Sequence, residues 1–356
     1  MKICYTENHR LHDPAFELFD GGQRVPYLES PERMDRILTA LRKTDWAQID
    51  EPRDFGLDPI RAAHSDAYLT FLASAWTEWL AADPESPAAT EKMALVPATF
   101  AAKRDQMPET ILGKAGFFLL DLSVPIVEGT YAAALSSANC ALSSAHFIVE
   151  HSSSSRSPSE FIIHNSSFAL CRPPGHHAGR EIAGGYCFLN NAAIAAQWLT
   201  RFGNVAILDV DYHAGNGTQD IFYSRRDVLT ISIHANPAFE YPYYAGYATE
   251  TGAGEGLGFH HNFPLPAGTD DAAYLNTLEK ALALIREFAP AHLVISLGMD
   301  IYGGDPLGRF MLTRDGIGEI GYRIAALKLP SAIVMEGGYN TDALGENIAA
   351  FVEKFA

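Results

Sequence analysis

Residues 205–217, VAILDVDYHAGNG, restrict the possible folds of this chain more than any other stretch. They begin with an apolar run and end in a glycine-rich turn, a pattern typical of a strand buried on both faces of a parallel sheet. Alternate residues of a strand share a face, so Asp209, Asp211 and His213 would project from one side if the extended conformation continues. Two carboxylates and an imidazole at the end of a strand indicate half of a metal site.

Strands and helices alternate through the C-terminal half of the chain. The predicted strands are 167–171, 205–210, 228–233, 292–297 and 332–335, and the predicted helices are 190–201, 217–223, 271–288, 314–327 and 341–355, with long loops at 172–187 and 236–270. This order predicts an α/β fold with a single mainly parallel β-sheet flanked by helices on both faces. Ligands of such sheets bind beyond the carboxyl ends of the strands.

The N-terminal half is predicted to belong to the same single domain, residues 1–356. A strand at 2–5 and a loop at 6–30 precede helices near 31–43, after Ser65 and at 130–151, and a polar loop at 152–159 is too short to be a domain linker. Residues 82–128 show no clean periodicity. We predict that this insertion shapes the mouth of a binding site or forms an interface between subunits.

Charge and cysteine content narrow the partners and the compartment. The 356 residues carry a formal net charge of −17, which argues against nucleic acid or an anionic membrane as the main partner. The same charge would attract a cationic substrate, although an acidic surface also simply keeps a protein soluble.

The four cysteines show no CxxC spacing, the N-terminus has no apolar signal core, and no window approaches about 18 uninterrupted apolar residues. A cytoplasmic location with free thiols is therefore expected.

Polar residues follow several of the predicted strands, where one shared site is expected. Asp211, His213 and Asp300 make a set of oxygen and nitrogen ligands with an open fourth position, as in catalytic zinc sites. Because this set contains two hard carboxylates, Fe²⁺ or Co²⁺ could also occupy it.

Two further motifs supply groups for proton transfer and carbonyl activation. His176 and His177 follow a PPG segment that restricts the backbone, and imidazoles titrate near neutrality. Tyr339 follows two glycines that allow the backbone to approach a ligand closely, so its phenol is expected to donate to an oxyanion.

Five blocks of the chain stand in a characteristic order, namely RPPGHHAG (172–179), GGYCFLNNAAIAA (184–196), VAILDVDYHAGNGTQDIFY (205–223), ISLGMDIYGGDPLG (295–308) and VMEGGYN (334–340). In this order they resemble the histone deacetylase superfamily, and they look closest to its bacterial acetylpolyamine amidohydrolase branch. The N-terminal segments CYTENHRLHDPAFEL and VPYLESPER are similar as well, so the resemblance spans nearly the whole chain.

The resemblance implies an arginase/deacetylase fold and the hydrolysis of an acetamide to an amine and acetate, with one Zn²⁺ per subunit. The zinc ligands would be Asp211, His213 and Asp300. His177 would be the general base that takes a proton from zinc-bound water and later protonates the leaving amine.

Other residues would support this chemistry by the same resemblance. His176 would be mainly an electrostatic partner oriented by Asp209, and Asn216 would orient His177. A carboxylate neighbour favours imidazolium, whereas an amide leaves the second imidazole freer to exchange protons. Tyr339 would polarise the carbonyl together with the metal and stabilise the tetrahedral oxyanion.

The resemblance also implies a monovalent cation site, for K⁺, and a substrate tunnel. The K⁺ would be held by side chains or backbone carbonyls of Asp209, Asp211, His213, Ser232 and Ile233. The tunnel would be lined by Gly185, Tyr186 and Tyr241, with Leu307 near the mouth. Paired aromatic side chains suit a slot for an unbranched alkyl chain.

The chain departs from the polyamine branch at positions that would meet a distal ammonium. Leu112 and Ser123 stand where that branch has glutamates, with Asp121 and Glu128 nearby, and Leu307 is not an acidic gatekeeper. Two substrate classes therefore stay open, namely small N-acetylated amines such as acetylpolyamines, and acetyl-lysine in proteins. An insertion that narrows the mouth would favour the small amines.

Two other functions fit the sequence less well. Binuclear ureohydrolases of this fold need carboxylates at the positions of Gly215 and Tyr302, so one metal is expected rather than two. A non-catalytic binding module predicts loss of a metal ligand or of Tyr339, and all of them are present. We therefore expect a homodimeric deacetylating hydrolase with a small acetylated amine, rather than nucleic acid or a membrane, as its partner.

Overall fold

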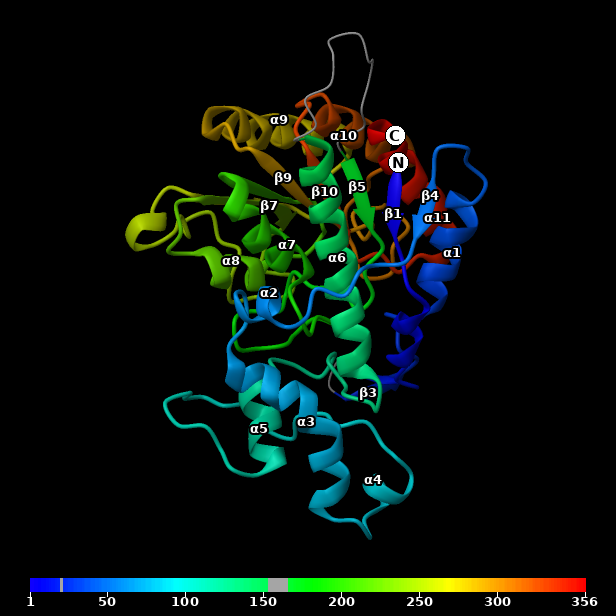
Figure 1. The fold of residues 1–356 in the computed structure, drawn as a ribbon, viewed down its shortest axis with the longest axis vertical. Coiled ribbons are helices and arrows are strands. Elements are labelled where there is room, and N and C mark those ends of the chain that lie inside the picture. Colours follow the sequence, from blue (N-terminus) through cyan, green and yellow to red (C-terminus); the bar gives the residue numbers. More distant parts are fainter. Residues whose placement is uncertain (20–21, 153–165) are drawn as a thin grey trace.

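A parallel sheet forms the centre of the molecule in this computed structural model. Within residues 1–19, 22–152 and 166–356, which the structure describes, eight strands form this sheet and every neighbouring pair is parallel (Figure 1). Their order is β4 (Gln48–Asp50), β1 (Lys2–Cys4), β5 (Ser166–Ala169), β10 (Ser331–Met335), β9 (His292–Leu297), β6 (Val205–Asp209), β7 (Val228–Ala235) and β8 (His260–Leu265). The predicted α/β fold is confirmed.

Helices cover both faces of this sheet because its strands are apolar on both faces. In β6, Ala206 and Leu208 pack into the apolar cluster that contains α1, α9, α10 and α11, whereas Val205 and Ile207 pack into the cluster with α6 and α7. One layer therefore consists of α6 (Thr130–Ser152), α7 (Asn191–Leu199) and α8 (Asn216–Phe222). The other consists of α1 (Glu32–Leu41), α9 (Asp271–Phe288), α10 (Arg314–Ala325) and α11 (Thr341–Val352).

The neighbouring strands β6 and β9 mark the place where a ligand crevice is expected. Helix α8 follows β6 and packs against α7. Helix α10 follows β9 and packs with α9 and α11 on the opposite face of the sheet. Ligands of open α/β sheets bind where the following helices diverge in this way. The register pairs Asp209 with Ser296, so residues 211–213 and 298–300 leave the sheet side by side.

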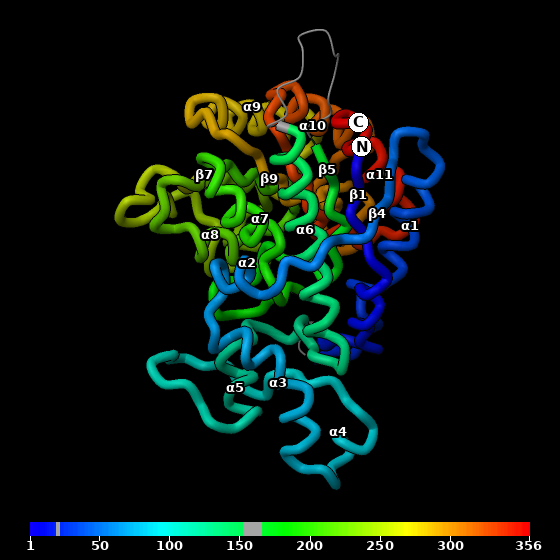
Figure 2. Tube along the Cα trace, in the orientation of Figure 1, coloured from blue at the N-terminus to red at the C-terminus, as the bar shows by residue number. Residues whose placement is uncertain are grey.

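A helical lobe extends beyond the carboxyl end of the sheet, at the bottom of Figures 1 and 2. It contains α3 (Asp66–Ala82), α4 (Pro87–Thr90) and α5 (Ile111–Phe118), and α2 (Asp58–Arg61) precedes it. An apolar cluster that includes Phe71 and Phe118 of the lobe and Phe188 of the main body holds the two together. Residues 82–128 therefore form an excursion at the end of the molecule where the strand-end residues lie.

Several elements differ from the predictions. Strand β8 lies within the predicted loop 236–270, and the hairpin of β2 (Glu17–Phe19) and β3 (Gln23–Val25) lies within the predicted loop 6–30. Strand β4 lies in a segment for which no element was predicted. Strand β8, HHNFPL, escapes sequence reasoning because it lacks a β-branched run and contains Pro264, which an edge strand tolerates. Residues 153–159 of the predicted polar loop lie outside the described residues.

Helix α6 confirms the prediction for 130–151 and is long and apolar enough to resemble a membrane span. However, 61% of that window is buried inside the molecule, where the helix packs against β5 and β10. Core helices of this kind pass the same test of length and composition, so the helix is explained by its packing.

A buried histidine supports the loop that follows β5. His64 is fully buried, and its Nε2 accepts a hydrogen bond of 2.9 Å from the backbone N–H of Asn190. The Asn190 side chain caps α7 and donates to the carbonyl of Ala178, which directly follows the two adjacent histidines. This chain of contacts ties the segment before α3 to the predicted catalytic loop.

We predict that His64 makes the fold acid-labile. Burial lowers the pKa of His64 to about 4, below its ordinary value of 6.5, so the folded state binds fewer protons than the unfolded state. Its contribution to stability is therefore complete above pH 6.5 and falls as the pH drops toward 4, by about 2 kcal/mol at pH 5. Urea unfolding at pH 7.5 and 5.0 should show a smaller pH effect in His64→Gln, which keeps an acceptor but does not titrate. Equal pH effects in the wild type and the variant would show that His64 does not contribute to the pH dependence of the free energy of unfolding.

Candidate active site

The residues singled out at the strand ends meet in one cavity of about 300 Å³. It opens at the carboxyl end of the sheet, between the loops that follow β5, β6, β7, β9 and β10. The side chains or backbone that line it include His176, His177, Gly185, Tyr186, His213, Tyr241, Leu307, Gly337 and Tyr339. The buried Asp209, Asp211 and Asp300 lie directly behind the cavity wall, in contact with these histidines.

Asp211, His213 and Asp300 are arranged as a metal site would require. One ligand atom from each lies within 4.8 Å of the other two. The Nδ1 atom of His213 is 3.3 Å from Oδ1 of Asp211 and 3.0 Å from Oδ2 of Asp300. Zinc bonds of about 2.0–2.2 Å in a tetrahedral site separate neighbouring ligand atoms by roughly 3.3–3.6 Å, so this donor set fits a small divalent cation.

The backbone around this site holds the two carboxylates in place. The N–H of Gly337 donates to Oδ2 of Asp211 at 2.9 Å, and the N–H of Tyr212 donates to Oδ1 of Asp300 at 2.9 Å. A Cβ atom on Gly337 would lie 2.7 Å from Oδ2 of Asp211 and 2.6 Å from Oδ2 of Asp300. Position 337 must therefore be glycine for the carboxylates to converge, which explains the GG dipeptide before Tyr339.

The electrostatics of the site favour a bound cation. Burial lowers the pKa of His213, but Asp211 and Asp300 raise it more, to about 10. Burial and the neighbouring Asp211 charge raise the pKa of Asp300 to about 7. A site that attracts protons this strongly also attracts a divalent cation, which displaces the proton when it binds.

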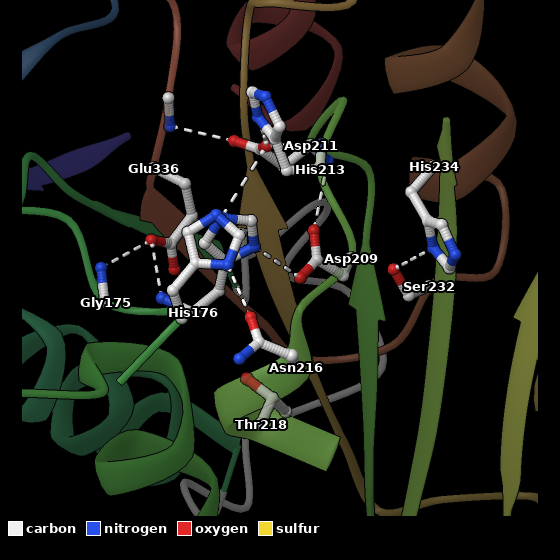
Figure 3. Close-up of polar contacts among 12 residues, drawn as sticks. Gly175, His176, Asp209, Asp211, His213, Asn216, Thr218, Ser232, His234 and Glu336 are labelled. Carbon is white, nitrogen blue, oxygen red and sulfur yellow. Dashed lines mark hydrogen bonds and ion pairs between the residues drawn. The ribbon is translucent and has the colours of Figure 1, made fainter. Parts of the chain in front are cut away.

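The two adjacent histidines have opposite environments, and Figure 3 shows that of His176. The Nδ1 atom of His176 is 2.9 Å from Oδ2 of Asp209, and the nearby Asp211 and Asp209 charges raise its pKa well above 6.5 against the effect of burial. The Nδ1 atom of His177 is 2.6 Å from Oδ1 of Asn216. Burial, followed by the charges of His176 and His213, lowers the pKa of His177. His176 is thus suited to be an imidazolium and His177 a neutral base.

The tautomer of His177 follows from its partner. The Oδ1 atom of Asn216 can only accept, so Nδ1 of His177 carries the proton and its Nε2 is left as an acceptor. The His177 ring lies 4.9 Å from the ring of Tyr241, perpendicular to it, at the wall of the cavity. This arrangement presents a proton acceptor to a molecule bound in the cavity.

Two buried residues for which the sequence predicted no role fix the loops of this site. The Oε2 atom of Glu336 accepts from the N–H groups of Gly175 at 2.6 Å and His176 at 3.0 Å. The guanidinium of Arg33 donates to the carbonyls of Gly338 and Glu336 and lies 4.9 Å from the Tyr339 ring. The sequence placed Arg33 only at the start of a helix and Glu336 only beside a GGY motif. A buried arginine gives no local signal.

The hydroxyl groups of both tunnel tyrosines donate to carboxylates. Tyr186 donates to Oε2 of Glu17 at 2.7 Å, and Tyr241 donates to Oδ2 of Asp121 at 2.6 Å. Asp121 also accepts from the N–H of Gly185 at 2.9 Å, so the 82–128 excursion reaches the tunnel wall. Burial raises the pKa of Glu17. Neither carboxylate was assigned to the tunnel from the sequence.

The other residues considered in the 82–128 segment fall into two groups. Ser123 lines the cavity, and its hydroxyl donates to Asp121 at 2.6 Å. Glu128 instead pairs with Lys92 at the surface, at 3.5 Å, and Leu112 is 46% exposed outside the cavity lining. Only the Asp121–Ser123 part of the excursion thus contacts the site.

The residues expected to hold K⁺ also lie together. Asp209 is opposite Ser232 in the register of β6 and β7, with Ile233 next along the strand, and Oδ1 of Asp209 accepts from the N–H of Asp211 at 3.0 Å. The Ser232 hydroxyl is 2.7 Å from Nδ1 of His234. The binding of K⁺ by this group stays a prediction.

Comparisons with known proteins agree with this geometry. A family model described as a histone deacetylase domain matches residues 27–355. Acetylpolyamine amidohydrolase 2 of Pseudomonas aeruginosa is 43% identical to this chain over 359 residues, and the match covers 100% of this chain and 98% of that protein. Acetylpolyamine amidohydrolase 1 of the same organism is 44% identical over 353 residues, and the match covers 98% of this chain and 96% of that protein. The crystal structure of an acetylpolyamine aminohydrolase from Burkholderia pseudomallei superposes with a TM-score of 0.91 at 40% identity, covering 100% of this chain and 98% of that one.

We predict that Gly337→Ala weakens zinc binding roughly 10- to 100-fold while the fold is kept, because the new methyl group would push two ligand carboxylates apart. Zinc retention against a graded chelator measures the affinity, and circular dichroism of the metal-free protein checks the fold. Gly318→Ala in α10 is the matched control, since its Cβ would lie 3.5 Å from the nearest atom, the carbonyl oxygen of Ala350. Unchanged zinc affinity in Gly337→Ala would contradict the ligand arrangement.

Proposed function

The chain belongs to the histone deacetylase family of amide hydrolases, and from that premise we propose that it removes the acetyl group from small N-acetylated amines, such as acetyldiamines and acetylpolyamines. The supporting observation is the convergence, in one cavity, of a three-residue ligand set, a neutral imidazole beside a charged one, and a buried phenol. These are the groups that amide hydrolysis by an activated water needs.

Asp211, His213 and Asp300 would hold one Zn²⁺, with Fe²⁺ or Co²⁺ as chemically acceptable substitutes. When bound there, zinc would supply Lewis-acid polarisation of the amide carbonyl and would lower the pKa of a water molecule. The remaining steps belong to the protein. His177 would accept the proton of the attacking water at Nε2 and return it to the amine nitrogen as the C–N bond breaks.

His176 and Tyr339 would stabilise the negative charge that develops on the substrate oxygen. Burial raises the pKa of Tyr339 well above 10, so its phenol stays protonated and can donate. Arg33 adds positive charge behind the Tyr339 ring. The His176 imidazolium lies 4.0 Å, between ring centroids, from His177 and would keep that base from being protonated before the substrate binds.

The small-amine substrate is supported by the tunnel and by the relatives. Tyr186 and Tyr241 line the cavity, and each has a carboxylate, Glu17 or Asp121, behind its hydroxyl. Negative charge around an aromatic slot favours an alkyl chain that carries an ammonium group. The names of the most similar curated relatives refer to acetylpolyamines, and we extend that substrate class to this chain.

We also propose the homodimer expected from the sequence. The 82–128 excursion exposes Met93, Phe100 and Met107, each 43–49% accessible, on a lobe beside the site. Contact between two such lobes would bury these side chains and narrow the cavity mouth.

We predict that Tyr339→Phe lowers kcat roughly 10²- to 10³-fold on an acetyldiamine, because one oxyanion donor is lost. Zinc content and the folded structure should be retained, since the phenol is not a ligand. The matched control is Tyr322→Phe on α10, where the tyrosine is 61% exposed. Unchanged turnover in Tyr339→Phe would remove the oxyanion role.

We predict that the wild-type enzyme prefers small acetylated amines to an acetyl-lysine peptide by more than tenfold in kcat/KM. The reason is that a cavity edged by the excursion and the 236–259 loop admits a flexible chain more readily than a peptide backbone. The assay compares acetylputrescine, acetylcadaverine, acetylspermidine and an acetyl-lysine peptide. A tenfold preference for the peptide would instead identify a protein deacetylase.

A further inference from the structure

An ion pair stands at the mouth of the cavity, and neither the sequence motifs nor the proposed chemistry uses it. Nε of Arg309 is 3.3 Å from Oε1 of Glu240, and both residues line the same cavity as His213 and Tyr339. The Arg309 side chain is 69% exposed and the Glu240 side chain only 15%. The pair thus extends from the wall of the cavity to solvent, whereas His176 at the floor is 2% exposed.

Both residues are carried by anchored backbone. The N–H of Glu240 donates to the carbonyl of Asn236 at 3.2 Å, and its carbonyl accepts from Tyr243 at 3.0 Å. The carbonyl of Arg309 accepts from Gly268 at 2.7 Å. Glu240 directly precedes Tyr241 of the tunnel wall, so a displacement of one would move the other. The backbone of both residues is therefore anchored beside the tunnel, while the exposed Arg309 side chain can adjust to a bound head group.

The pair has unused hydrogen-bonding capacity. A carboxylate offers about four acceptor positions and a guanidinium five N–H donors. Glu240 and Arg309 pair with each other, and the Glu240 carboxylate also faces the Tyr212 hydroxyl, whose pKa it raises in addition to the effect of burial. These contacts use only part of that capacity. An ion pair with one exposed partner is also weak and can be replaced by a ligand.

We propose that Glu240 and Arg309 form a head-group subsite that binds the zwitterionic end of a free amino acid. This proposal rests on the proposed deacetylase function and extends its substrates to free amino acids acetylated on a side-chain amine, such as Nε-acetyl-lysine and Nδ-acetylornithine. The α-ammonium would pair with Glu240, and the α-carboxylate would take the N–H donors of Arg309.

Charge balance favours a zwitterion over a plain amine at this subsite. A diamine satisfies Glu240 but leaves Arg309 unpaired beside a second cation, whereas a zwitterion pairs with both. Within a protein, the α-amine and α-carboxylate of lysine are amides, so acetyl-lysine in a polypeptide loses this recognition. The subsite thus separates free amino acids from peptides that carry the same acetylated side chain.

The test uses four acetamides that share one alkyl chain and differ only at the far end. Nε-acetyl-lysine carries both charges, N-acetylcadaverine only the ammonium, 6-acetamidohexanoate only the carboxylate, and N-pentylacetamide neither. Values of kcat/KM are compared for the wild type, Arg309→Gln, Glu240→Gln and a control, Arg226→Gln. Arg226 is the control because it forms a similar exposed ion pair, with Glu255 at 3.7 Å, and lines a different cavity.

The wild type should hydrolyse Nε-acetyl-lysine with a kcat/KM at least equal to that of N-acetylcadaverine. Arg309→Gln should lower the ratio of acetyl-lysine to acetylcadaverine at least tenfold, and Glu240→Gln should lower the ratio of acetylcadaverine to N-pentylacetamide at least tenfold. Arg226→Gln should leave all ratios unchanged.

Two outcomes would overturn the proposal. One is a wild-type kcat/KM for Nε-acetyl-lysine below that for N-acetylcadaverine, which leaves the deacetylase function standing. The other is an equal loss on all four compounds in Arg309→Gln, which shows that the pair only supports the loops. Hydrolysis of none of the four by the zinc-loaded wild type would instead refute the deacetylase function itself.

Discussion

Buried carboxylates at the carboxyl edge of one sheet are the constraint on which the rest of this structure depends. Asp209, Asp211, Asp300 and Glu336 are each at most 2% exposed. An unpaired charge in such a place is strongly destabilising, so donors, protons or cations must balance each of them. Backbone N–H groups supply part of this balance, since each of these four carboxylates accepts at least one hydrogen bond from the backbone. The His176 imidazolium supplies another part, and a divalent cation would supply the rest.

The same constraint separates the two adjacent histidines into different roles. His176 lies between Asp209 and Asp211 and is held in its charged form, and that charge is a principal reason, after burial, why His177 stays neutral. A neutral imidazole beside Asn216 can accept a proton at once, whereas two equivalent histidines would compete for one. In the proposed mechanism, the neutral base is thus a consequence of the carboxylates that would also hold the metal, so a change to the metal site should also change the proton-transfer group.

The sequence predicted the parallel sheet and the strand-end residues because both are local patterns. Asp211 and Asp300 follow apolar strands within a few residues, and parallel strands bring such ends together. The tunnel carboxylates could not be predicted in this way, since Glu17 is 169 residues from Tyr186 and Asp121 is 120 residues from Tyr241. They lie in segments without periodicity, whose path depends on packing against the finished sheet. The edge strand β8 was also not predicted. Only two of its residues, His260 and Asn262, are buried, and both are polar, so the strand lacks an alternating apolar pattern.

Residues at the floor of the cavity make more contacts than residues at its mouth. This difference allows the substrate preference to change without a change in the residues proposed to carry the reaction. At the floor, Asp211 accepts hydrogen bonds from the backbone of His213 and Gly337 and contacts two histidines, so a change in position disturbs several partners at once. At the mouth, Arg309 is mostly exposed and meets a single carboxylate. We therefore expect a substitution at the floor to disrupt the ligand arrangement, and one at the mouth to change which head group is bound. Family membership indicates amide hydrolysis, and in our proposal the charged groups at the mouth would decide the amine on which this protein acts.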